Sequence, residues 1–331
     1  MSLFIKSLKK SGHLENIHMT ICNVGSRKLD ANDDYASLDW GIFAPNLTIY
    51  GFDADPDACD EANAKLEARR INWVEKHIPL ALSNSIGTST LYVTKNPMCS
   101  SLYPPNENYL KRFNPLPELV NLDFTVEIET TTLNEFCKSQ EINEIDFLQI
   151  DVQGAELNVL EGASLLLKKS ILAVQVEVEF SPLYLNQPLF PDVDIFLRNQ
   201  EFTLFDLANF HCLHSNSPIQ SSVRPGKLLW AEAFYFRDLI RDDITFKFKT
   251  PQQIFKLACI ADIMHFPDYA LELLEYLTIN YGSDPNYNFA NNIIESLGKF
   301  PELLNQGLDS LPIIEKMRAY LSSSQNDNNF Y

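Results

Sequence analysis

The chain has 331 residues, 45% of them hydrophobic, and carries a formal net charge of −18 at pH 7. This length suits one large domain with an appendage, and this hydrophobic share suits a packed core. The negative charge opposes binding to nucleic acid and to anionic membranes, so we expect neither as a partner. No apolar run reaches the roughly 18 residues of a membrane span.

The first ten residues carry lysines but no apolar segment or small-residue cleavage site, so we predict no secretory signal. The six cysteines are scattered along the chain and form no CxxC pair. Scattered cysteines favour reduced thiols over disulfides or a zinc knuckle. We therefore expect a cytoplasmic protein.

Short apolar runs alternate with segments of helical spacing from Met19 to Arg237. The predicted strands are 19–24, 47–52, 78–82, 90–94, 126–129, 147–150, 171–180, 202–207 and 228–236. The predicted helices are 57–70, one starting near Thr132, one after Gly154, and 192–200. Strand–helix alternation indicates an α/β fold, here a seven-stranded, mostly parallel sheet with an antiparallel pair at one edge.

The pattern changes outside this region. Residues 97–117 contain five prolines and no regular period, which predicts a long surface excursion. Residues 251–320 show helical spacing throughout, which predicts a small all-helical domain. It could mediate homo-oligomer formation, cover an active site or pack internally. The expected segments are an N-terminal helix or extension (1–17), an α/β domain (18–240), the helical domain (250–321) and a flexible tail (322–331).

Two strand ends carry a nucleotide-type signal. Gly25 follows the first strand, and Asp53 ends the second, where an acid can accept hydrogen bonds from a ribose diol. The residues directly after Gly25 (26–29) include no second or third glycine, so a pyrophosphate cradle and an NAD-type enzyme are disfavoured. A cofactor with a ribose but no phosphates, such as S-adenosylmethionine, fits better. Gly25 could also be a simple turn, and Asp53 a helix N-cap, although Asp55 is better placed for that role.

The stretch 146–163 is the most informative in the chain. An apolar run ends on Asp151, and Gln153-Gly154 then opens a segment with helical spacing. In a parallel sheet this transition marks the carboxyl edge, where ligands bind. We expect Leu157, Leu160 and residues 165–167 to face the sheet. Asp151 and Gln153 are not needed for packing, which makes them candidate site residues.

These residues resemble the FkbM family of S-adenosylmethionine-dependent methyltransferases, over roughly residues 18–237. The matching blocks are 146–163, Tyr50-Gly51-Phe52-Asp53, Leu80-Ala81-Leu82-Ser83, Ser100-Ser101-Leu102-Tyr103, Gln175-Val176-Glu177-Val178, Gln187-Pro188-Leu189-Phe190 and Leu229-Trp230-Ala231-Glu232. The resemblance implies a class I methyltransferase (Rossmann-like) fold. It also implies O-methylation of a hydroxyl on a sugar, small molecule or natural product.

By the same resemblance, three groups of residues contact the cofactor. Those near its methionine part are Asn23, Gly25 and Ser26; Asp53 holds the ribose; and Ala81 and Leu82 flank the adenine. We add Asp151 and Gln153, which end a strand at the same edge. The first loop departs from the family, because Asn23-Val24-Gly25-Ser26-Arg27 replaces the usual acidic-x-Gly-x-x-Gly form.

Methyl transfer to an alcohol needs alignment and removal of a proton. Asp151 ends one predicted strand, while Glu177 and Glu179 end the next, so these three carboxylates are the candidate catalytic residues. One of them could act directly as the base. Alternatively, Asp151 and Glu177 could bind a magnesium-like ion.

Other polar residues have weaker claims. Glu156 lies in a first helical turn, where an acid favours the helix dipole. Glu232 lies in an apolar strand and stays a minor site candidate. His211 and His214 are expected on a polar loop, as ordinary surface histidines.

Aromatic residues of the excursion, Tyr103, Tyr109 and Phe113, could form a substrate lid or simply anchor the excursion to the domain. The irregular first loop leaves open a second class of function, a non-catalytic cofactor-binding or scaffold protein. An enzyme with a small-molecule or glycan acceptor remains the leading hypothesis.

Overall fold

The structure is a computed structural model that describes residues 2–27, 39–241, 243, 249–305 and 307–327. It divides into two compact units. The α/β unit comprises Thr20–Leu29 and Thr48–Asp238. The helical unit comprises Met1–Met19, Asp30–Leu47 and Leu239–Tyr331. This division differs from the expected one, because the segments that end at Met19 and at Leu47 group with the C-terminal helices.

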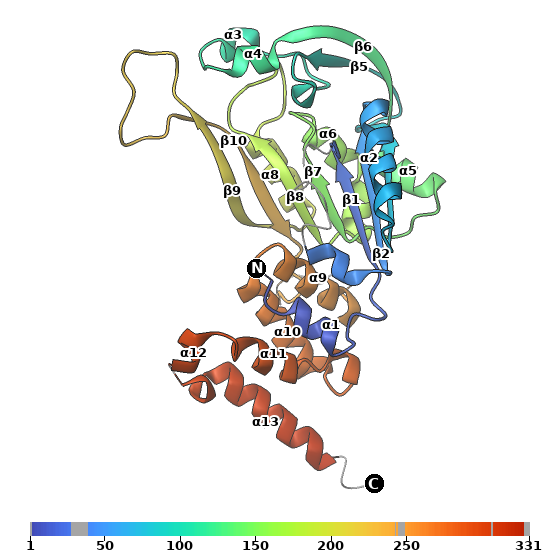
Figure 1. Ribbon diagram of the computed structural model, residues 1–331, viewed down its shortest axis with the longest axis vertical. Helices are drawn as coiled ribbons and strands as arrows, with labels where there is room; N and C mark the ends of the chain where they lie inside the picture. Colours follow the sequence, from blue (N-terminus) through green and yellow to red (C-terminus); the bar gives the residue numbers. More distant parts are fainter. Residues whose placement is uncertain (1, 28–38, 242, 244–248, 306, 328–331) are drawn as a thin grey trace. The chain divides into compact units, whose positions relative to one another are not determined.

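Seven strands form the main sheet, in the order β3-β2-β1-β7-β8-β10-β9 (Figure 1). Their bounds are β1 Met19–Val24, β2 Leu47–Asp53, β3 Val74–Pro79, β7 Phe147–Ile150, β8 Ala173–Glu179, β9 Thr203–Leu213 and β10 Lys227–Phe236. β1 pairs with β7, β2 with β3 and β7 with β8 in parallel, whereas β10 is antiparallel to both β8 and β9. The mostly parallel seven-stranded sheet with an antiparallel edge pair is confirmed.

A second, three-stranded sheet has the order β4-β6-β5. Its strands are β4 Ala81–Leu82, β5 Gly87–Thr94 and β6 Leu122–Thr131. The proline-rich excursion between β5 and β6 is more regular than predicted, with η3 Pro97–Cys99, α3 Glu107–Leu110 and α4 Leu116–Val120. Its apolar side chains Leu110, Phe113, Leu116 and Val120 form a small core together with Leu183, Tyr184 and Leu229.

The other helices of the α/β unit are α2 Pro56–Arg69, α5 Leu133–Ser139, α6 Glu156–Gly162, α7 Ser164–Lys169 and α8 Phe190–Asn199. Two of them, α2 and α5, begin at a side-chain N-cap. The Asp55 carboxylate accepts the Asp57 N–H at 3.0 Å, and the Thr132 hydroxyl accepts the Glu135 N–H at 3.1 Å. These bonds satisfy backbone donors that a first turn leaves free. The predicted capping role of Asp55 is confirmed.

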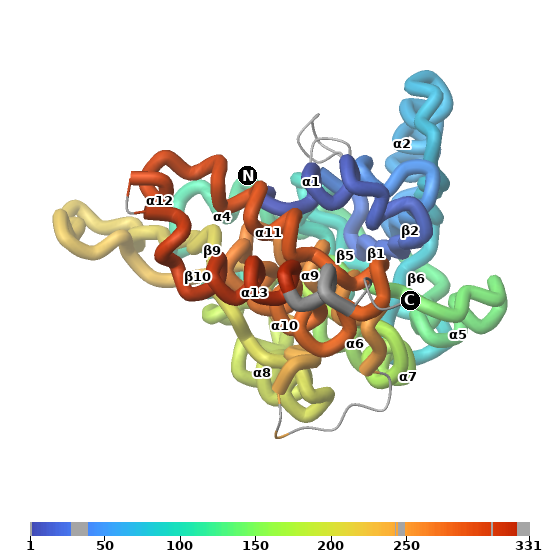
Figure 2. The backbone as a smooth tube through the Cα atoms, turned by 90° about the horizontal axis from the view of Figure 1, so that it is seen from below, coloured from blue at the N-terminus to red at the C-terminus, as the bar shows by residue number. Residues whose placement is uncertain are grey.

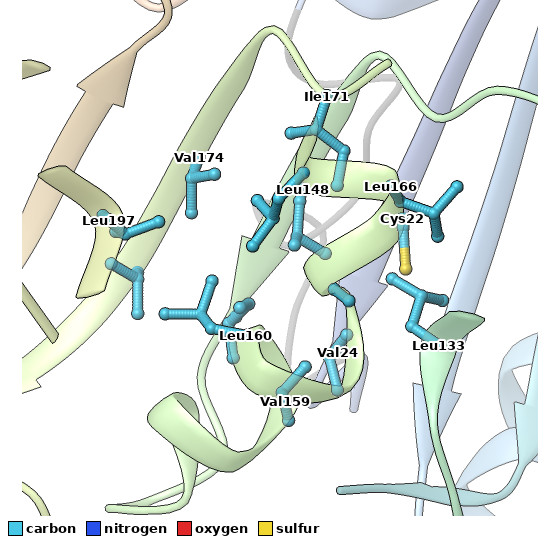
Figure 3. Packing of buried hydrophobic residues seen from close by; sticks show 14 of the residues in the cluster. Cys22, Val24, Leu133, Leu148, Val159, Leu160, Leu166, Ile171, Val174 and Leu197 are labelled. Atoms are coloured by element: carbon cyan, nitrogen blue, oxygen red, sulfur yellow. The ribbon is translucent and has the colours of Figure 1, made fainter. Parts of the chain in front are cut away.

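The main core lies between the sheet and the helices α5 to α8 (Figure 3). Alternate residues of neighbouring strands, such as Leu148 and Val174, face Leu160 and Leu197 of the helices. Because side chains alternate across a strand, the residues between them point to the other face. The expectation for residues 165–167 was wrong at Leu165, which is 67% exposed.

The helical unit contains α1 Ile5–Lys10, η2 Asp39–Phe43, α9 Pro251–Ile263, α10 Pro267–Tyr281, η4 Pro285–Tyr287, α11 Ala290–Leu297, α12 Pro301–Asn305, η5 Leu308–Ser310 and α13 Pro312–Asp327. Helix α1 packs with α9 and α11 (Figure 2). The N-terminal segment is thus part of a helical core. The predicted flexible tail (322–331) is shorter than expected, because α13 continues past residue 321 to Asp327. Of this tail, residues 328–331 lie outside the described part of the chain.

Within the described part of the chain, we find no helix with both the length and the apolar composition of a membrane span. All six cysteines are free thiols, and four of them are buried: Cys22, Cys59, Cys137 and Cys259.

Candidate functional site

The loops after β1 and β7 touch at the carboxyl edge of the main sheet. The Asp151 N–H donates to the Val24 carbonyl at 2.9 Å. Gly25 has a φ of +85°, and a Cβ at this position would lie 1.8 Å from the Asp151 carbonyl oxygen. Glycine is therefore required here for the approach of one loop to the other, whereas the sequence suggested an approach to a ligand.

A cluster of carboxyl groups lies beside this contact. Oxygens of Asp151, Glu156 and Glu177 lie within 4.8 Å of one another. Asp151 and Glu177 are brought together by register, because the preceding residues Ile150 and Val176 are partners across β7 and β8. Glu179 lies two residues farther along β8 and is buried. The structure thus brings together the two acids that the sequence placed on neighbouring strands.

Glu156 is the cluster member that sequence reasoning missed. Its Oε1 accepts the backbone N–H groups of Val152 at 2.9 Å and Gly154 at 3.1 Å. The side chain is buried, and burial, followed by the nearby Asp151 charge, raises the pKa of its carboxyl to about 7. The signal in the sequence was an acid two residues after Gln153-Gly154. At that position a carboxylate oxygen can accept hydrogen bonds from the N–H groups of the loop, as well as favour the helix dipole.

Gln153 connects the members of this cluster. Its side-chain Nε2 donates to Asp151 Oδ1 at 2.8 Å and to Glu177 Oε2 at 2.9 Å. Its Oε1 accepts the Tyr184 hydroxyl at 3.1 Å, and its backbone carbonyl accepts the Ser101 hydroxyl at 2.6 Å. Gln153 has a φ of +58°, a left-handed conformation that is uncommon outside glycine. These bonds hold it in that conformation.

The acids differ in their environments. Burial, then the charges of Asp151 and Glu179, raises the pKa of Glu177 well above its ordinary value. Burial, then the charges of Glu156 and Asp151, does the same for Glu179. Both acids therefore favour the protonated form more than a free glutamic acid does. Burial also raises the pKa of Asp151, whereas its hydrogen bonds with Gln153 and Glu177 act in the opposite direction. Asp151 is the most exposed residue of the three, so its carboxyl group is the one that an incoming group can reach.

Asp53 occupies the corresponding end of β2. Its Oδ1 accepts the Asp55 N–H at 2.9 Å, and Arg27 Nε lies 3.9 Å from its Oδ2. Burial raises the pKa of the Asp53 carboxyl, while the Asp55 N–H and Arg27 act in the opposite direction. A carboxylate accepts about four hydrogen bonds, so Asp53 keeps capacity for a ligand.

The remaining predicted cofactor residues have different surroundings. Asn23 is half-buried in β1, in register with Gln149 of β7. Ala81 is half-buried, whereas the Leu82 side chain belongs to the main core. Ser26 is 3% exposed, and its hydroxyl bonds to the ring of His77.

Two of the weaker candidates have defined partners. Glu232 is in register with Glu177 and accepts the Gln175 side-chain amide at 3.1 Å. His211 does not lie on a loop as predicted. It lies within β9 because that strand extends to Leu213, and its ring stacks on Trp230 at 4.5 Å. His214 lies beyond β9 and lines a polar pocket with Asn114, Asn216, Ser217, Pro218 and Gln220.

The aromatic residues of the excursion serve as anchors in the structure. Phe113 is buried in the small core, and Tyr109 packs against its ring at 5.4 Å. The Tyr103 hydroxyl donates to Asn158 Oδ1 at 3.1 Å. The excursion is thereby attached to α6, close to the acidic cluster.

Three solved structures that resemble this chain are distant likenesses. Methyltransferase FkbM from Methylobacillus flagellatus KT is 10% identical, with a TM-score of 0.38; the match covers 67% of this chain and 45% of that one. This chain thus spans less than half of that protein. Magnesium protoporphyrin IX methyltransferase (ChlM) from Synechocystis PCC 6803, with bound SAM, is 11% identical with a TM-score of 0.33, covering 71% and 76% of the two chains. TrmK from M. capricolum, in complex with S-adenosyl-homocysteine, is 10% identical with a TM-score of 0.33, covering 98% of each.

A search of curated protein sequences found no match. A family model, in contrast, matches more than half of the chain: the methyltransferase FkbM domain, over residues 30–204. The match includes β2, the acidic cluster and the excursion, but it begins at residue 30 and so leaves out β1 and residues 25–27. The strand order agrees with it, because a seven-stranded sheet with an antiparallel edge pair is the expected class I methyltransferase architecture. The chain belongs to the family of FkbM-domain methyltransferases.

Proposed function

We propose that the protein is an S-adenosylmethionine-dependent O-methyltransferase acting on a hydroxyl of a sugar, small-molecule or natural-product acceptor. The observation that carries this proposal is the exposed Asp151 carboxylate. Gln153 donates to it and to Glu177, a less exposed acid whose pKa burial raises well above its ordinary value. Two neighbouring acids in different surroundings are typical of acid–base sites. The charge of −18 supports a small-molecule or glycan acceptor over nucleic acid.

The chemistry of the residues near the first loop fits the cofactor. Asp53 has acceptor capacity for the two hydroxyls of a ribose. Asn23 and Gly25 end β1 next to it, and the half-buried Ala81 can contribute apolar surface beside an adenine. When bound, the cofactor supplies a methyl group already activated by a positively charged sulfur.

The protein then has two tasks. Asp151 accepts the proton of the acceptor hydroxyl as the new oxygen–carbon bond forms and the sulfur–carbon bond breaks. Gln153 fixes the orientation of the Asp151 carboxylate by donating to its Oδ1, which leaves Oδ2 for the acceptor. Alignment of this kind accounts for a large part of rate acceleration. The raised pKa of Glu177 favours its protonated form beside the Asp151 carboxylate.

A magnesium-like ion bound by Asp151 and Glu177 is the alternative form of the site. The Gln153 Nε2 donates to both of these carboxyl groups, at 2.8 and 2.9 Å. An ion between them would have to displace this amide, and a positive charge is repelled by its N–H groups. This contact favours direct base catalysis.

Titration calorimetry with SAM tests the cofactor assignment. The wild-type protein is expected to bind, and Asp53→Ala to weaken binding at least tenfold because the ribose loses its acceptor. Asp57→Asn, which changes an exposed acid in the first turn of α2, is the matched control. Absence of wild-type binding at millimolar SAM would reject the enzyme in favour of a scaffold protein. An acceptor screen with and without EDTA then tests both the substrate class and the metal.

A further inference from the structure

We infer that Ser26, His77 and Glu75 form a buried hydrogen-bonded chain that positions the loop after β1 for the cofactor. The Ser26 hydroxyl lies 2.9 Å from His77 Nδ1, and His77 Nε2 lies 3.3 Å from Glu75 Oε1. The chain ends at Trp73, whose indole N–H donates to Glu75 Oε2 at 3.0 Å. The inference rests on the proposed function, because it assigns the loop to cofactor binding.

The chain is fully enclosed. The His77 and Glu75 side chains are 1% and 0% exposed. Gly51 of β2 leaves space for it: a Cβ there would lie 2.5 Å from His77 Nδ1 and 2.7 Å from the Ser26 hydroxyl oxygen. Burying polar groups costs free energy unless each is hydrogen-bonded, so this arrangement depends on all of its members.

The donors and acceptors of the chain can be assigned from chemistry. An indole N–H only donates, and a carboxylate only accepts. Glu75 therefore accepts from both Trp73 and His77, which places the imidazole proton on Nε2. His77 Nδ1 is left as an acceptor, and the Ser26 hydroxyl donates to it.

The chain holds a loop that is also held by its backbone. The N–H groups of Gly25 and Ser26 both donate to the Phe52 carbonyl at 2.9 Å. His77 is fixed in turn by Asn63 of α2, which donates to its carbonyl at 2.8 Å and accepts its N–H at 2.9 Å. The loop is thus tied to β2 through its backbone and to β3 through Ser26.

This anchoring compensates for the missing glycines of the first loop. A glycine-rich turn lets the backbone approach a ligand closely. Here the loop has a single glycine, and the buried Ser26 side chain holds it in place through its hydrogen bond to His77. His77 and Glu75 are positioning residues: they act through Ser26 and do not touch the cofactor.

Glu75→Gln is a specific probe of the chain. Trp73 still needs an acceptor, so the new amide must direct its oxygen to Trp73 and its NH₂ group to His77 Nε2. The imidazole proton then has to move to Nδ1, and the Ser26 hydroxyl hydrogen loses its acceptor. Nitrogen-15 NMR of the His77 ring in the full-length protein should show the Nε2–H tautomer in wild type and the Nδ1–H tautomer in Glu75→Gln.

Calorimetry with SAM completes the test. Glu75→Gln and Ser26→Ala should each weaken SAM binding roughly tenfold. The matched control is Ser170→Ala, which removes a buried serine hydroxyl that accepts the Ile145 N–H at 3.2 Å, just before β7 begins. Its binding of SAM should stay within twofold of wild type, although it too loses a buried hydrogen bond.

The outcomes are distinguishable. An Nδ1–H or doubly protonated His77 in the wild-type protein would overturn the chain as assigned. Unchanged SAM binding in both variants would overturn its positioning role, as would an equal loss in Ser170→Ala. Absence of SAM binding by wild type would instead overturn the proposed function, and the cofactor role of the hydrogen-bonded chain with it. The tautomer of His77 would still test whether the hydrogen bonds of that chain are as assigned.

Discussion

The Tyr184 hydroxyl lies against the oxygen of the Gln153 amide. Its single hydrogen is shared between two acceptors, Gln153 Oε1 at 3.1 Å and the Cys99 carbonyl at 2.9 Å. Burial raises the pKa of Tyr184 well above its ordinary value, so the hydroxyl keeps its proton. With the amide oxygen directed at Tyr184, the amide NH₂ must face Asp151 and Glu177. A residue of the small core thereby orients the candidate catalytic acid.

Tyr184→Phe should therefore lower kcat about tenfold, because the Gln153 amide is free to rotate. The KM for SAM should stay within twofold, since Asp53 and the first loop are unchanged. Steady-state kinetics measure both quantities. Tyr103→Phe removes a hydroxyl that bonds to Asn158, away from the acids, and should leave kcat unchanged. Equal losses in the two variants would contradict the orienting role.

Asp151→Asn should lower turnover at least ~100-fold if Asp151 is the base. The asparagine oxygen still accepts from Gln153, so the geometry of the loop is kept while the basic group is lost. SAM affinity measured by calorimetry should stay within about threefold. Asp206→Asn, at an exposed acid of β9, is the control. Near-normal turnover of Asp151→Asn would remove this residue from the mechanism.

Glu156 predicts a pH dependence of stability. Its pKa is about 7 in the folded protein and 4.5 as the ordinary value, so the folded state holds this proton more tightly. Stability should therefore fall as pH rises from about 4.5 to about 7. Glu156→Gln keeps the accepting Oε1 and removes this loss.

Urea unfolding at several pH values measures the effect. The Glu156→Gln variant should match wild type near pH 4.5 and exceed it at pH 8 by up to about 3 kcal/mol. Glu161→Gln, at an exposed position of the same helix, should show no such pH-dependent difference. A variant whose advantage does not grow with pH would show that Glu156 is charged in the folded protein.

Asp262 should be essential to the helical unit. Its carboxylate accepts the backbone N–H groups of Leu3, Phe4 and Ile5 at 2.7–2.8 Å, in a buried setting. Asp262→Ala leaves these donors without their acceptor and should cost about 3 kcal/mol. Hydrogen exchange at residues 3–5 should accelerate, whereas Asp268→Ala, at an exposed first-turn acid, should leave it unchanged. Unaltered protection in Asp262→Ala would contradict this anchoring.

Sequence patterns predicted the ends of strands and the starts of helices correctly where the local signal and the tertiary packing agree. The apolar run ending at Asp151 predicted a strand edge, and Asp55 predicted a helix start, because strand ends and caps depend on neighbours in the chain. Element bounds were less accurate. β9 was drawn six residues too short at its C-terminal end, so His211 was placed on a loop. Its packing partner Trp230 lies on another strand, and no local pattern reveals that contact.

By itself, the sequence determined the α/β class, the mostly parallel sheet with an antiparallel edge pair, and the two acids on neighbouring strands. These follow from periodicity and from motifs that act over a few residues. Only the tertiary structure decided that Gly25 serves the contact with Asp151, that Glu156 belongs to the acidic cluster, and that the first loop is tied to β3 through Ser26 and His77. Each of these depends on atoms from segments far apart in the chain. Burial and hydrogen bonding between such segments set the charge and direction of the groups, and neither can be read along the sequence.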